Sequence, residues 1–573
     1  MGKSALKSAP YGESDFSILR GNNLAYVDKT EFIAKLESLN NRYPFIIRPR
    51  RFGKTLFASI LQAYYDITAA KDFERNFSGT YIGEHKTALA NSFRVLHFDF
   101  SGIPSDNFTE GFIAKLKGGI SSFCTRNGFE DGFQLLEKDF TNPVALIVEF
   151  FSSYERRFQE KIYLIIDEYD QGANEVLATS LESFKNLTKS GGPLKTFYSN
   201  IKDFSSGGPI ARVFTTGVTS IQLDSMTSGF SVANNLSTDE RFATMFGFTE
   251  SELKHLIPQL VDLEKYGKTL EEVFSHMKEW YNGYCFNPDT RETVFNSSMC
   301  LYYLDSIAEV GKEPRSMLDP SFVNSLGKIE ALFSLGDDNF IRSIVDKALS
   351  RKEIEFSGVL RSIDLNMKNA LDEEDILSIL FYMGFLTFVP GNWEALCVPN
   401  RAIGIQFFEY YFKHVLHAKK YNFNPALFST AYAALREGDP KPWLELVDKL
   451  LTSTSGSHLA SHTSETAFQM QLSATLWASE DYAGQLELES RGEKSGFIDL
   501  LLKPRGNPKL PSYLIELKHV KADATETTIK SALTSAKEQA LRYSVGEIPK
   551  KIPNLKRLAI VYAGLRLTAF EVF

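Results

Sequence analysis

One stretch of the chain, FIIRPRRFGKT (45–55), holds residue types that bind phosphate. Gly53, Lys54 and Thr55 stand between a short apolar run and an amphipathic segment, which predicts a strand, a loop and a helix. In that setting backbone N–H groups and a helix N-terminus converge on phosphates, a lysine neutralises their charge and a hydroxyl binds Mg²⁺. Arg48, however, occupies the position of the usual first glycine. By the usual pattern the motif is incomplete.

Two adjacent acidic residues, Asp167 and Glu168, follow the apolar run of KIYLIIDEYD (161–170). An acidic residue at such a strand end holds Mg²⁺ in P-loop ATPases, and a following Glu polarises the attacking water. A buried strand whose acidic end merely meets solvent is the alternative. Because this motif and the Gly-Lys-Thr motif occur together and in the right order, the sequence favours a nucleotide site.

Several strings of the chain together resemble the AAA-ATPase-like family of P-loop proteins. They are YVDKTEFIAKLE, RPRRFGKT, IIDEYD, TTGVTSIQLDSMTSGFSVANNL with MFGFTESEL, and WYNGYCF, within about residues 10–300. In that family RPRRFGK[ST] is itself the phosphate loop, so Arg48 belongs to the family's own form of the motif. The resemblance implies ATP and Mg²⁺ as cofactors. The nucleotide-binding residues it implies are Arg51, Phe52, Gly53, Lys54, Thr55, Asp167 and Thr216.

The same resemblance implies a role for each of the polar residues. Lys54 is expected on the phosphates, and Thr55 and Asp167 on Mg²⁺. Glu168 is the expected catalytic base, and Thr216 is expected to sense the γ-phosphate. ATP rather than GTP rests on the resemblance alone, because the sequence offers no base-recognition motif in a suitable place.

A second group of charged residues lies near the C-terminus, in a stretch (494–520) that reads as strand, Pro/Gly turn, strand. The period of two puts Glu516 and Lys518 on one face, and hairpin pairing brings Asp499 near Glu516. Two adjacent carboxylates bind Mg²⁺, and a lysine beside them orients or deprotonates the attacking water. The pattern suits metal-dependent phosphodiester hydrolysis. A structural Glu–Lys pair on an edge strand is the alternative.

This region, about residues 455–573, resembles the PD-(D/E)XK nuclease superfamily, and more narrowly the nuclease-like domain that often follows an AAA-ATPase-like domain. The resemblance implies that Asp499, Glu516 and Lys518 are catalytic, and that the two carboxylates bind the metal. Either Glu465 or Glu489 would supply a further acid. Residues that match the Q-x-x-x-Y pattern often found after the core are Gln539 and Tyr543.

The elements that must position these residues change in character along the chain. Short β-like runs separated by helix-length segments predict a parallel α/β sheet up to about residue 250, followed by a mostly helical region. The segment 376–400 has the order helix then hairpin, which fits either a winged-helix unit or a packing hairpin. The expected domains are a P-loop AAA-ATPase-like domain (10–250), a helical lid or relay (251–450) with a winged-helix-like segment (372–400), a linker (452–464) and a restriction-endonuclease-like α/β domain (465–573).

Length and composition limit the class of protein. At 573 residues and 64.6 kDa the chain exceeds one hydrophobic core. A net charge of -8 and a pI of about 5.8 argue against a uniformly basic surface that coats nucleic acid, although a local basic groove remains open. The four scattered cysteines contain no C-x-x-C pair, which disfavours a disulfide framework and a zinc knuckle. No apolar run is long enough for a membrane span, so we expect a cytoplasmic or nuclear protein.

Together the sequence predicts an ATP-binding and ATP-hydrolysing protein whose nucleotide cycle gates a Mg²⁺-dependent nuclease-like domain acting on DNA or RNA. The alternative is a nucleotide-dependent switch whose nuclease-like domain binds nucleic acid or a partner without cutting. An arginine finger from a neighbouring subunit would imply a homo-oligomer, with Arg212 and Arg241 as candidates.

Overall fold

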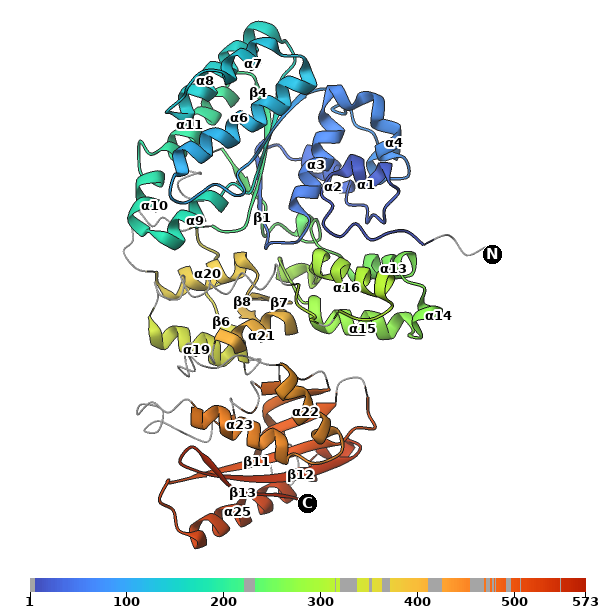
Figure 1. The fold of residues 1–573 in the computed structure, drawn as a ribbon, viewed down its shortest axis with the longest axis vertical. Coiled ribbons are helices and arrows are strands. Elements are labelled where there is room, and N and C mark those ends of the chain that lie inside the picture. The colour runs from blue at the N-terminus through green and yellow to red at the C-terminus, as the bar shows by residue number, and fades with distance from the viewer. Residues whose placement is uncertain are drawn as a thin grey trace. The chain divides into compact units, whose positions relative to one another are not determined.

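The structure is a computed structural model that describes most of the chain from residue 6 to residue 573. The residues outside the description are 221–231, 315, 320–336, 350–352, 363–370, 411–424, 454–467, 470–471, 473–474, 477–478, 480, 491–495, 505–506 and 547. The chain forms two compact units (Figure 1). The first comprises Met1–Asp337 and Glu355–Asn400, and the second comprises Asp338–Ile354 and Arg401–Phe573. The chain therefore passes between the units three times.

The first unit is built on a five-stranded sheet in the order β2-β3-β4-β1-β5. Its strands are β1 (Pro44–Ile47), β2 (Arg94–Asp99), β3 (Ile162–Asp167), β4 (Ile210–Gly217) and β5 (Asn234–Asn235). Every pair of neighbours is parallel, which confirms the predicted parallel α/β sheet. Each residue of β1 and β3 is buried, as expected for strands covered on both faces. The carboxyl ends of the strands meet at one edge, where Asp99 is paired in register with Asp167.

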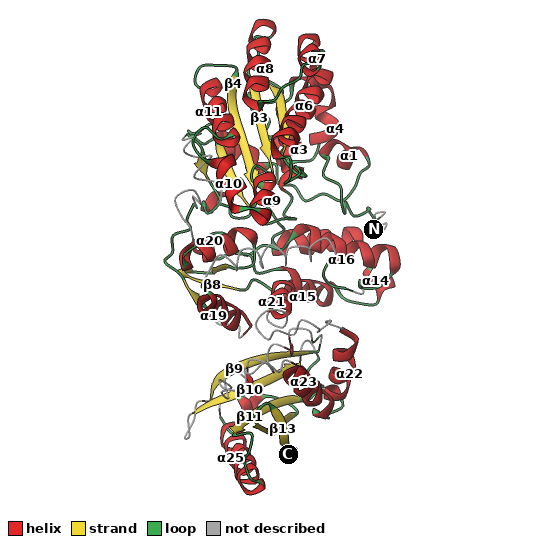
Figure 2. Cartoon of the chain, turned by 60° about the vertical axis from the view of Figure 1, so that its left-hand side comes forward, coloured by secondary structure: helices red, strands yellow, loops and turns green. Residues whose placement is uncertain are grey.

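Helices surround this sheet, as the red elements around the yellow strands show in Figure 2. The helix α3 (Lys54–Tyr65) packs against β2 and β3, and its buried residues include Phe57, Ile60, Leu61 and Tyr64, spaced three and four apart. The other helices before residue 210 are α1 (Phe16–Gly21), α2 (Glu31–Glu37), α4 (Phe73–Phe77), α5 (Tyr81–Glu84), α6 (Phe108–Asn127), α7 (Glu130–Leu136), α8 (Pro143–Arg157), α9 (Gln171–Thr179), α10 (Leu181–Thr188) and α11 (Pro193–Ser205).

After the sheet the first unit becomes mainly helical, as the sequence predicts. Its helices there are α13 (Glu250–Leu260), α14 (Leu263–Tyr266), α15 (Leu270–Tyr281), α16 (Ser297–Val310) and α20 (Glu373–Met383). Capping boxes, in which side chain and backbone bond reciprocally, begin α13 at Thr249 and α15 at Thr269. The predicted helical region from residue 251 to residue 450 is divided between the two units.

The predicted order of helix then hairpin after residue 376 is confirmed. Helix α20 is followed by the antiparallel strands β7 (Thr387–Val389) and β8 (Asn392–Cys397), and β8 also pairs with the short strand β6 (Ile354–Glu355). Gly384 ends α20 with a φ of 83°, and a side chain there would come within 2.7 Å of Pro49. The hairpin therefore packs against the loop that follows β1. Its winged-helix identity remains a prediction.

The second unit holds a mixed sheet in the order β13-β12-β11-β10-β9. Its strands are β9 (Tyr482–Ser490), β10 (Gly496–Pro504), β11 (Ser512–Val520), β12 (Leu555–Ala563) and β13 (Arg566–Val572). β10 and β11 form the predicted hairpin, and β11 runs parallel to β12. The long helix α25 (Glu526–Ser544) packs on β11 and β12. The remaining helices are α19 (Asp338–Leu349), α21 (Arg401–Tyr410), α22 (Pro425–Arg436) and α23 (Lys441–Ser453).

The structure also bears on the predicted linker and on membrane-spanning helices. Helix α23 continues to Ser453, and the predicted linker beyond that residue lies outside the described residues. No helix in the described part of the chain combines the length and the apolar character that crossing a membrane requires.

Arg48 holds the loop between β1 and α3 from inside the first unit. Its guanidinium group is 1% exposed and donates hydrogen bonds to the carbonyl oxygens of Ile47 (2.8 Å), Ser237 (2.7 Å) and Phe242 (3.0 Å). It also lies 4.1 Å from the ring centroid of Phe286. Burial lowers the pKa of Arg48 to about 9, which still leaves the group charged at neutral pH. The cation of Arg48 is therefore engaged with internal carbonyl groups.

Replacing Arg48 by Met should lower the midpoint of thermal unfolding of the first unit. The change removes one donor from each of three buried carbonyl groups, and each group left unsatisfied costs about 1–3 kcal/mol. The carbonyl oxygen of Phe242 keeps a second donor, the N–H of Met245 (3.2 Å). Arg48→Lys should recover only part of the loss, since an ammonium group lacks the fork geometry. Arg157→Met, at an exposed position of α8, is the control and should change stability by less than about 0.5 kcal/mol. Equal midpoints for the Arg48→Met and Arg157→Met variants would contradict the role given to Arg48.

Candidate functional site

The loop between β1 and α3 presents an uncapped helix N-terminus. Gly53 precedes α3 with a φ of 90°, and no side chain caps the helix. The first N–H groups of a helix have no partner within it and carry a partial positive charge. Arg51 also has a left-handed backbone, with a φ of 72°. The loop thus turns at Arg51 and Gly53, whereas Arg48 is not among the described residues with positive φ. The uncapped N-terminus of α3 is therefore suited to bind an anion.

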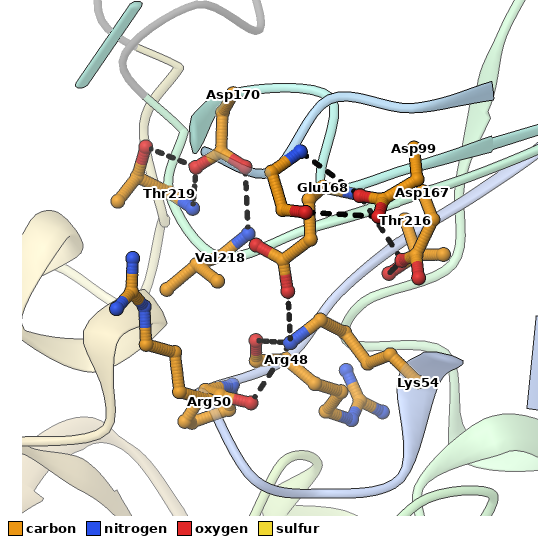
Figure 3. Close-up of polar contacts among 12 residues, drawn as sticks. Arg48, Arg50, Lys54, Asp99, Asp167, Glu168, Asp170, Thr216, Val218 and Thr219 are labelled. Carbon is orange, nitrogen blue, oxygen red and sulfur yellow. Dashed lines mark hydrogen bonds and ion pairs between the residues drawn. The ribbon is translucent and has the colours of Figure 1, made fainter. Parts of the chain in front are cut away.

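Lys54 is directed back across this loop. Its ammonium group is almost fully buried and donates hydrogen bonds to the carbonyl oxygens of Arg48 (3.2 Å) and Pro49 (3.1 Å). Its Nζ lies 3.7 Å from Oε1 of Glu168, an ion pair drawn in Figure 3. The structure therefore brings together the lysine and the expected catalytic base. A phosphate group at the loop would compete with Glu168 for the same cation.

Asp167 lies at the end of β3 and is fully buried. Its Oδ1 accepts hydrogen bonds from the backbone N–H of Glu168 (3.0 Å) and the hydroxyl of Thr216 (3.5 Å). Its Oδ2 has no hydrogen-bond partner among the described residues. Burial, followed by the charge of Glu168, raises the pKa of Asp167 to about 6, while Thr55 and Lys54 oppose the rise. A buried carboxylate oxygen without a partner, beside a threonine hydroxyl, fits a Mg²⁺ ligand set.

Glu168 has an unusual backbone for a glutamate. Its φ is 52°, a left-handed conformation that residues with side chains adopt only occasionally. Its Oε2 is buried and has no hydrogen-bond partner in the described part of the chain. Backbone conformations of this kind cluster at functional sites, which makes the carboxyl end of β3 a candidate for one.

Asp170 is a residue of this site that sequence reasoning missed. It is fully buried, and its carboxylate accepts hydrogen bonds from Asn174 (2.7 Å), from the N–H of Val218 (3.0 Å) and from both N–H (2.6 Å) and hydroxyl (2.7 Å) of Thr219. These bonds fasten the end of β4 to the segment after β3 (Figure 3). The second Asp of DEYD was the available signal.

Arg51 and Phe52 take roles that their positions in the motif do not reveal. Nη1 of Arg51 lies 3.7 Å from Oδ2 of Asp319, which also accepts a hydrogen bond from the hydroxyl of Tyr11 (2.5 Å). Phe52 is buried edge-on against Tyr284, with ring centroids 4.8 Å apart. Only the backbone of Phe52 is therefore left for a nucleotide.

A second constellation lies in the second unit, at Asp499 and Glu516. Asp499 accepts hydrogen bonds from the side chain of Gln469 (2.7 Å) and the N–H of Leu517 (2.7 Å), and its own N–H donates to Oε1 of Glu516 (3.4 Å). Glu516 is 1% exposed. Burial, followed by the charge of Asp499, raises the pKa of Glu516 to about 9, although Lys518 and Arg542 act to lower it. The two predicted carboxylates are thus adjacent, and Glu516 holds a proton at neutral pH.

The structure describes only some of the other residues predicted for this site. Gln539 and Tyr543 lie on α25, and Oε1 of Gln539 is buried without a hydrogen-bond partner among the described residues. The hydroxyl of Tyr543 accepts a hydrogen bond from Arg542 (2.9 Å). Glu489 is on β9, but its side chain is outside the description, as is Glu465 entirely. Within the described residues no group of three or more His, Cys, Asp and Glu side chains is arranged to hold a metal ion.

Of the two arginine-finger candidates, Arg212 lies within β4, next to Tyr163 of β3 in the sheet register. Arg241 forms an exposed ion pair with Asp239 at 2.6 Å.

Comparisons with known proteins match parts of the chain. Residues 10–227 match the family model described as "Predicted AAA-ATPase". A protein of Azotobacter chroococcum mcd 1, described as "Uncharacterized protein in vnfD 5'region", is 27% identical over 292 residues, which are 51% of this chain and 50% of that protein. The chain thus matches about half the length of this relative. The Walker-type ATPase of Pyrococcus abyssi aligns with 66% of this chain and 94% of its own at 12% identity, but a TM-score of 0.35 does not establish a common fold. The N-terminal region of the chain carries a predicted AAA-ATPase-like domain.

Proposed function

We propose that the first unit binds ATP together with Mg²⁺ and hydrolyses it. The observation that carries the proposal is the uncapped N-terminus of α3, with the ammonium group of Lys54 and the unpartnered Oδ2 of Asp167 beside it. An anion-binding helix end, a lysine and a strand-end carboxylate are the parts that P-loop catalysis requires. The family match over residues 10–227 supports ATP as the nucleotide.

Each residue then has a task in hydrolysis. When ATP binds, the ammonium group of Lys54 leaves its ion pair with Glu168 and pairs with a phosphate oxygen. The Glu168 carboxylate can then accept a proton from the attacking water. Thr55 and Asp167 hold Mg²⁺, which supplies neutralisation of phosphate charge when bound. Asp170 has an indirect role. Its hydrogen bonds hold the segment after β4, which keeps the hydroxyl of Thr216 within hydrogen-bond distance of Asp167. Asp170 is thus a positioning residue.

We further propose that this nucleotide cycle gates a Mg²⁺-dependent nuclease-like activity of the second unit on nucleic acid. The adjacent carboxylates of Asp499 and Glu516, on neighbouring strands of a mixed sheet covered by α25, support the assignment. Lys518 lies two residues beyond Glu516 and lowers the pKa of that carboxyl. A lysine in this place can orient the attacking water.

The alternative, a nuclease-like unit that binds without cutting, is supported by the burial of Glu516, which raises the pKa of this carboxyl group. Glu516 is protonated at neutral pH, and a carboxylic acid is a poor metal ligand until it loses its proton. Metal binding must therefore displace that proton, which makes cleavage dependent on pH and on Mg²⁺ concentration. A unit that only binds nucleic acid would leave the substrate intact at every pH.

Lys54→Ala should weaken ATP binding by about tenfold or more, since charge-assisted hydrogen bonds contribute about 1.5–3 kcal/mol. Isothermal titration calorimetry on the full chain measures the loss. Lys71→Ala removes an exposed lysine and should leave the affinity unchanged. Unchanged ATP binding by the Lys54→Ala variant would refute the nucleotide site.

The affinity for ATP with Mg²⁺ should fall as the pH drops below about 6, because Asp167 then takes up a proton and loses its charge. The affinity should fall about tenfold for each further unit of pH, because one proton competes with one metal ion for Asp167. Titrations on wild type and Asp167→Asn measure it, and the variant reports the pH dependence of the nucleotide alone. The same slope in both proteins would show that Asp167 does not hold the ion.

Cleavage of labelled DNA or RNA should require Mg²⁺ and should rise with pH toward about 9, where Glu516 loses its proton. A higher Mg²⁺ concentration should shift the profile to lower pH, since the ion competes with the proton. Asp499→Asn and Glu516→Gln should abolish cleavage, whereas Glu526→Gln, at a strongly exposed position of α25, should retain it. Cleavage that survives either active-site substitution would sink the nuclease assignment.

A further inference from the structure

The contacts of Arg51 join the phosphate loop to residues 316–319, a short described segment after α16. Nη1 of Arg51 lies 3.7 Å from Oδ2 of Asp319. The backbone carbonyl oxygen of Arg51 accepts hydrogen bonds from the N–H of Ser298 and the hydroxyl of Ser297, both at 3.1 Å and both in the first turn of α16. The loop is thus held through its backbone by the start of α16 and through a side chain by the segment that follows this helix.

Tyrosine hydroxyl groups anchor the segment 316–319. Their hydrogen bonds run from Tyr281 to the carbonyl oxygen of Met317 (2.8 Å), from Tyr302 to that of Ser316 (3.0 Å) and from Tyr11 to Oδ2 of Asp319 (2.5 Å). Burial, followed by the hydrogen bond to Asp319, raises the pKa of Tyr11 to about 12, so its hydroxyl keeps the proton that it donates. The carboxylate of Asp319 is therefore contacted by both Tyr11 and Arg51.

The ion pair between Arg51 and Asp319 is unequal in burial and long. The side chain of Asp319 is 5% exposed, whereas that of Arg51 is 35% exposed and remains within reach of a ligand. A buried carboxylate is costly unless it is paired, so Asp319 depends on its contacts more than Arg51 does. Charge-assisted hydrogen bonds are shorter, at about 2.7–2.9 Å. An anion that forms such bonds would bind the guanidinium group more strongly than Asp319 does at 3.7 Å.

Arg51 faces the same pocket as the phosphate-binding residues. A cavity of about 400 Å³ is lined by Arg51, Gly53, Lys54 and Thr55 together. Lys54 is paired in the same manner as Arg51, since its Nζ lies 3.7 Å from Oε1 of Glu168. A phosphate group in this cavity therefore meets two cations of the loop that each contact a carboxylate of the protein.

We propose that Asp319 competes with the nucleotide for Arg51: a bound phosphate group takes the guanidinium group from Asp319, and the segment 316–319 rearranges around the carboxylate that is left. The inference rests on the proposed ATP-binding function and adds the regulation of that site. Asp319 lowers the affinity for nucleotide, and its displacement marks nucleotide binding in the part of the chain that precedes the first crossing into the second unit, at Asp338.

The first test removes the competing charge. Asp319→Asn keeps an acceptor for Tyr11 but not the charge that holds Arg51, so it should tighten binding of ATP and of inorganic tripolyphosphate, each with Mg²⁺, by about threefold to tenfold. Isothermal titration calorimetry on the full chain measures both affinities. The matched control is Glu309→Gln, which removes one charge from an exposed position of α16 and should change each affinity by less than about twofold. Weaker or unchanged binding by the Asp319→Asn variant overturns the competition.

A double-mutant cycle shows whether the effect acts through Arg51. Arg51→Met should weaken ATP binding by about threefold or more, because it removes a cation from the loop. In the Arg51→Met background, Asp319→Asn should change the affinity by less than about twofold. An equal gain with and without Arg51 would mean that Asp319 merely repels the phosphates, which overturns the competition.

Tyr11→Phe repeats the test in case the Asp319→Asn variant fails to fold. Without the hydroxyl of Tyr11, Asp319 relies more on Arg51, so ATP binding should weaken by about twofold or more. This change has the opposite sign to that of Asp319→Asn. The weakening should disappear in the Arg51→Met background, and its persistence there overturns the competition.

Hydrogen exchange tests the response of the segment. In the full chain, amide exchange in peptides that cover residues 316–319 should rise by about threefold or more when ATP and Mg²⁺ saturate wild type. One amide concerned is the N–H of Leu318, which is bonded to the hydroxyl of Ser316 (3.3 Å). The Arg51→Met variant, also saturated, should show no rise. Unchanged or slower exchange in wild type overturns the proposed rearrangement.

The outcomes also separate this inference from the function on which it rests. If Lys54→Ala leaves the affinity for ATP and tripolyphosphate unchanged, the proposed function itself fails. If Lys54→Ala loses both affinities while Asp319→Asn binds no more tightly than wild type, the nucleotide site stands and only the competition by Asp319 fails.

Discussion

The guanidinium group of Arg48 is the interaction on which the first unit depends. It satisfies carbonyl groups from β1 and from the segment that includes Ser237 and Phe242, and it stacks on Phe286. A glycine at this position would let the loop turn freely, whereas the arginine fixes the loop by hydrogen bonds to its surroundings. In this loop, hydrogen bonds to the surrounding structure therefore take the place of the backbone freedom that a glycine would give.

The cross-links join motif strings that lie far apart in the sequence. Phe286 and Tyr284 of WYNGYCF pack on Arg48 and Phe52, so this string supports the loop from outside the sheet.

The two aspartates at and after the carboxyl end of β3, Asp167 and Asp170, differ in their hydrogen bonding. Asp170 is saturated with hydrogen bonds and is structural, while Asp167 keeps an oxygen without a partner among the described residues. Identical side chains three residues apart thus differ in their hydrogen bonding, and Asp167 is the one with a carboxylate oxygen left for a ligand.

Sequence reasoning succeeds here where the signal is local. Apolar runs predicted β1, β2, β3, β4 and the hairpin of the second unit, because buried strands need continuous apolar residues. The motifs assigned Lys54 and Glu168 to one site, but their ion pair was not predicted and is shown only by the structure. The contact of Arg51 with Asp319 could not be predicted, because it joins residues far apart in sequence. Likewise, no local pattern reveals that Arg48 turns inward or that β1 lies between β4 and β5.

The division of the chain into discontinuous units limits how the protein can be taken apart. Because Asp338–Ile354 belongs to the second unit although Glu355–Asn400 returns to the first, no single cut yields both units whole. A truncation at residue 400 would leave α19 behind without α21, the helix it packs against. During synthesis in a cell, residues 338–354 leave the ribosome before residues 401–573, the other part of the second unit. That segment must wait for Arg401–Phe573, so the second unit completes its folding only after synthesis of the entire first unit.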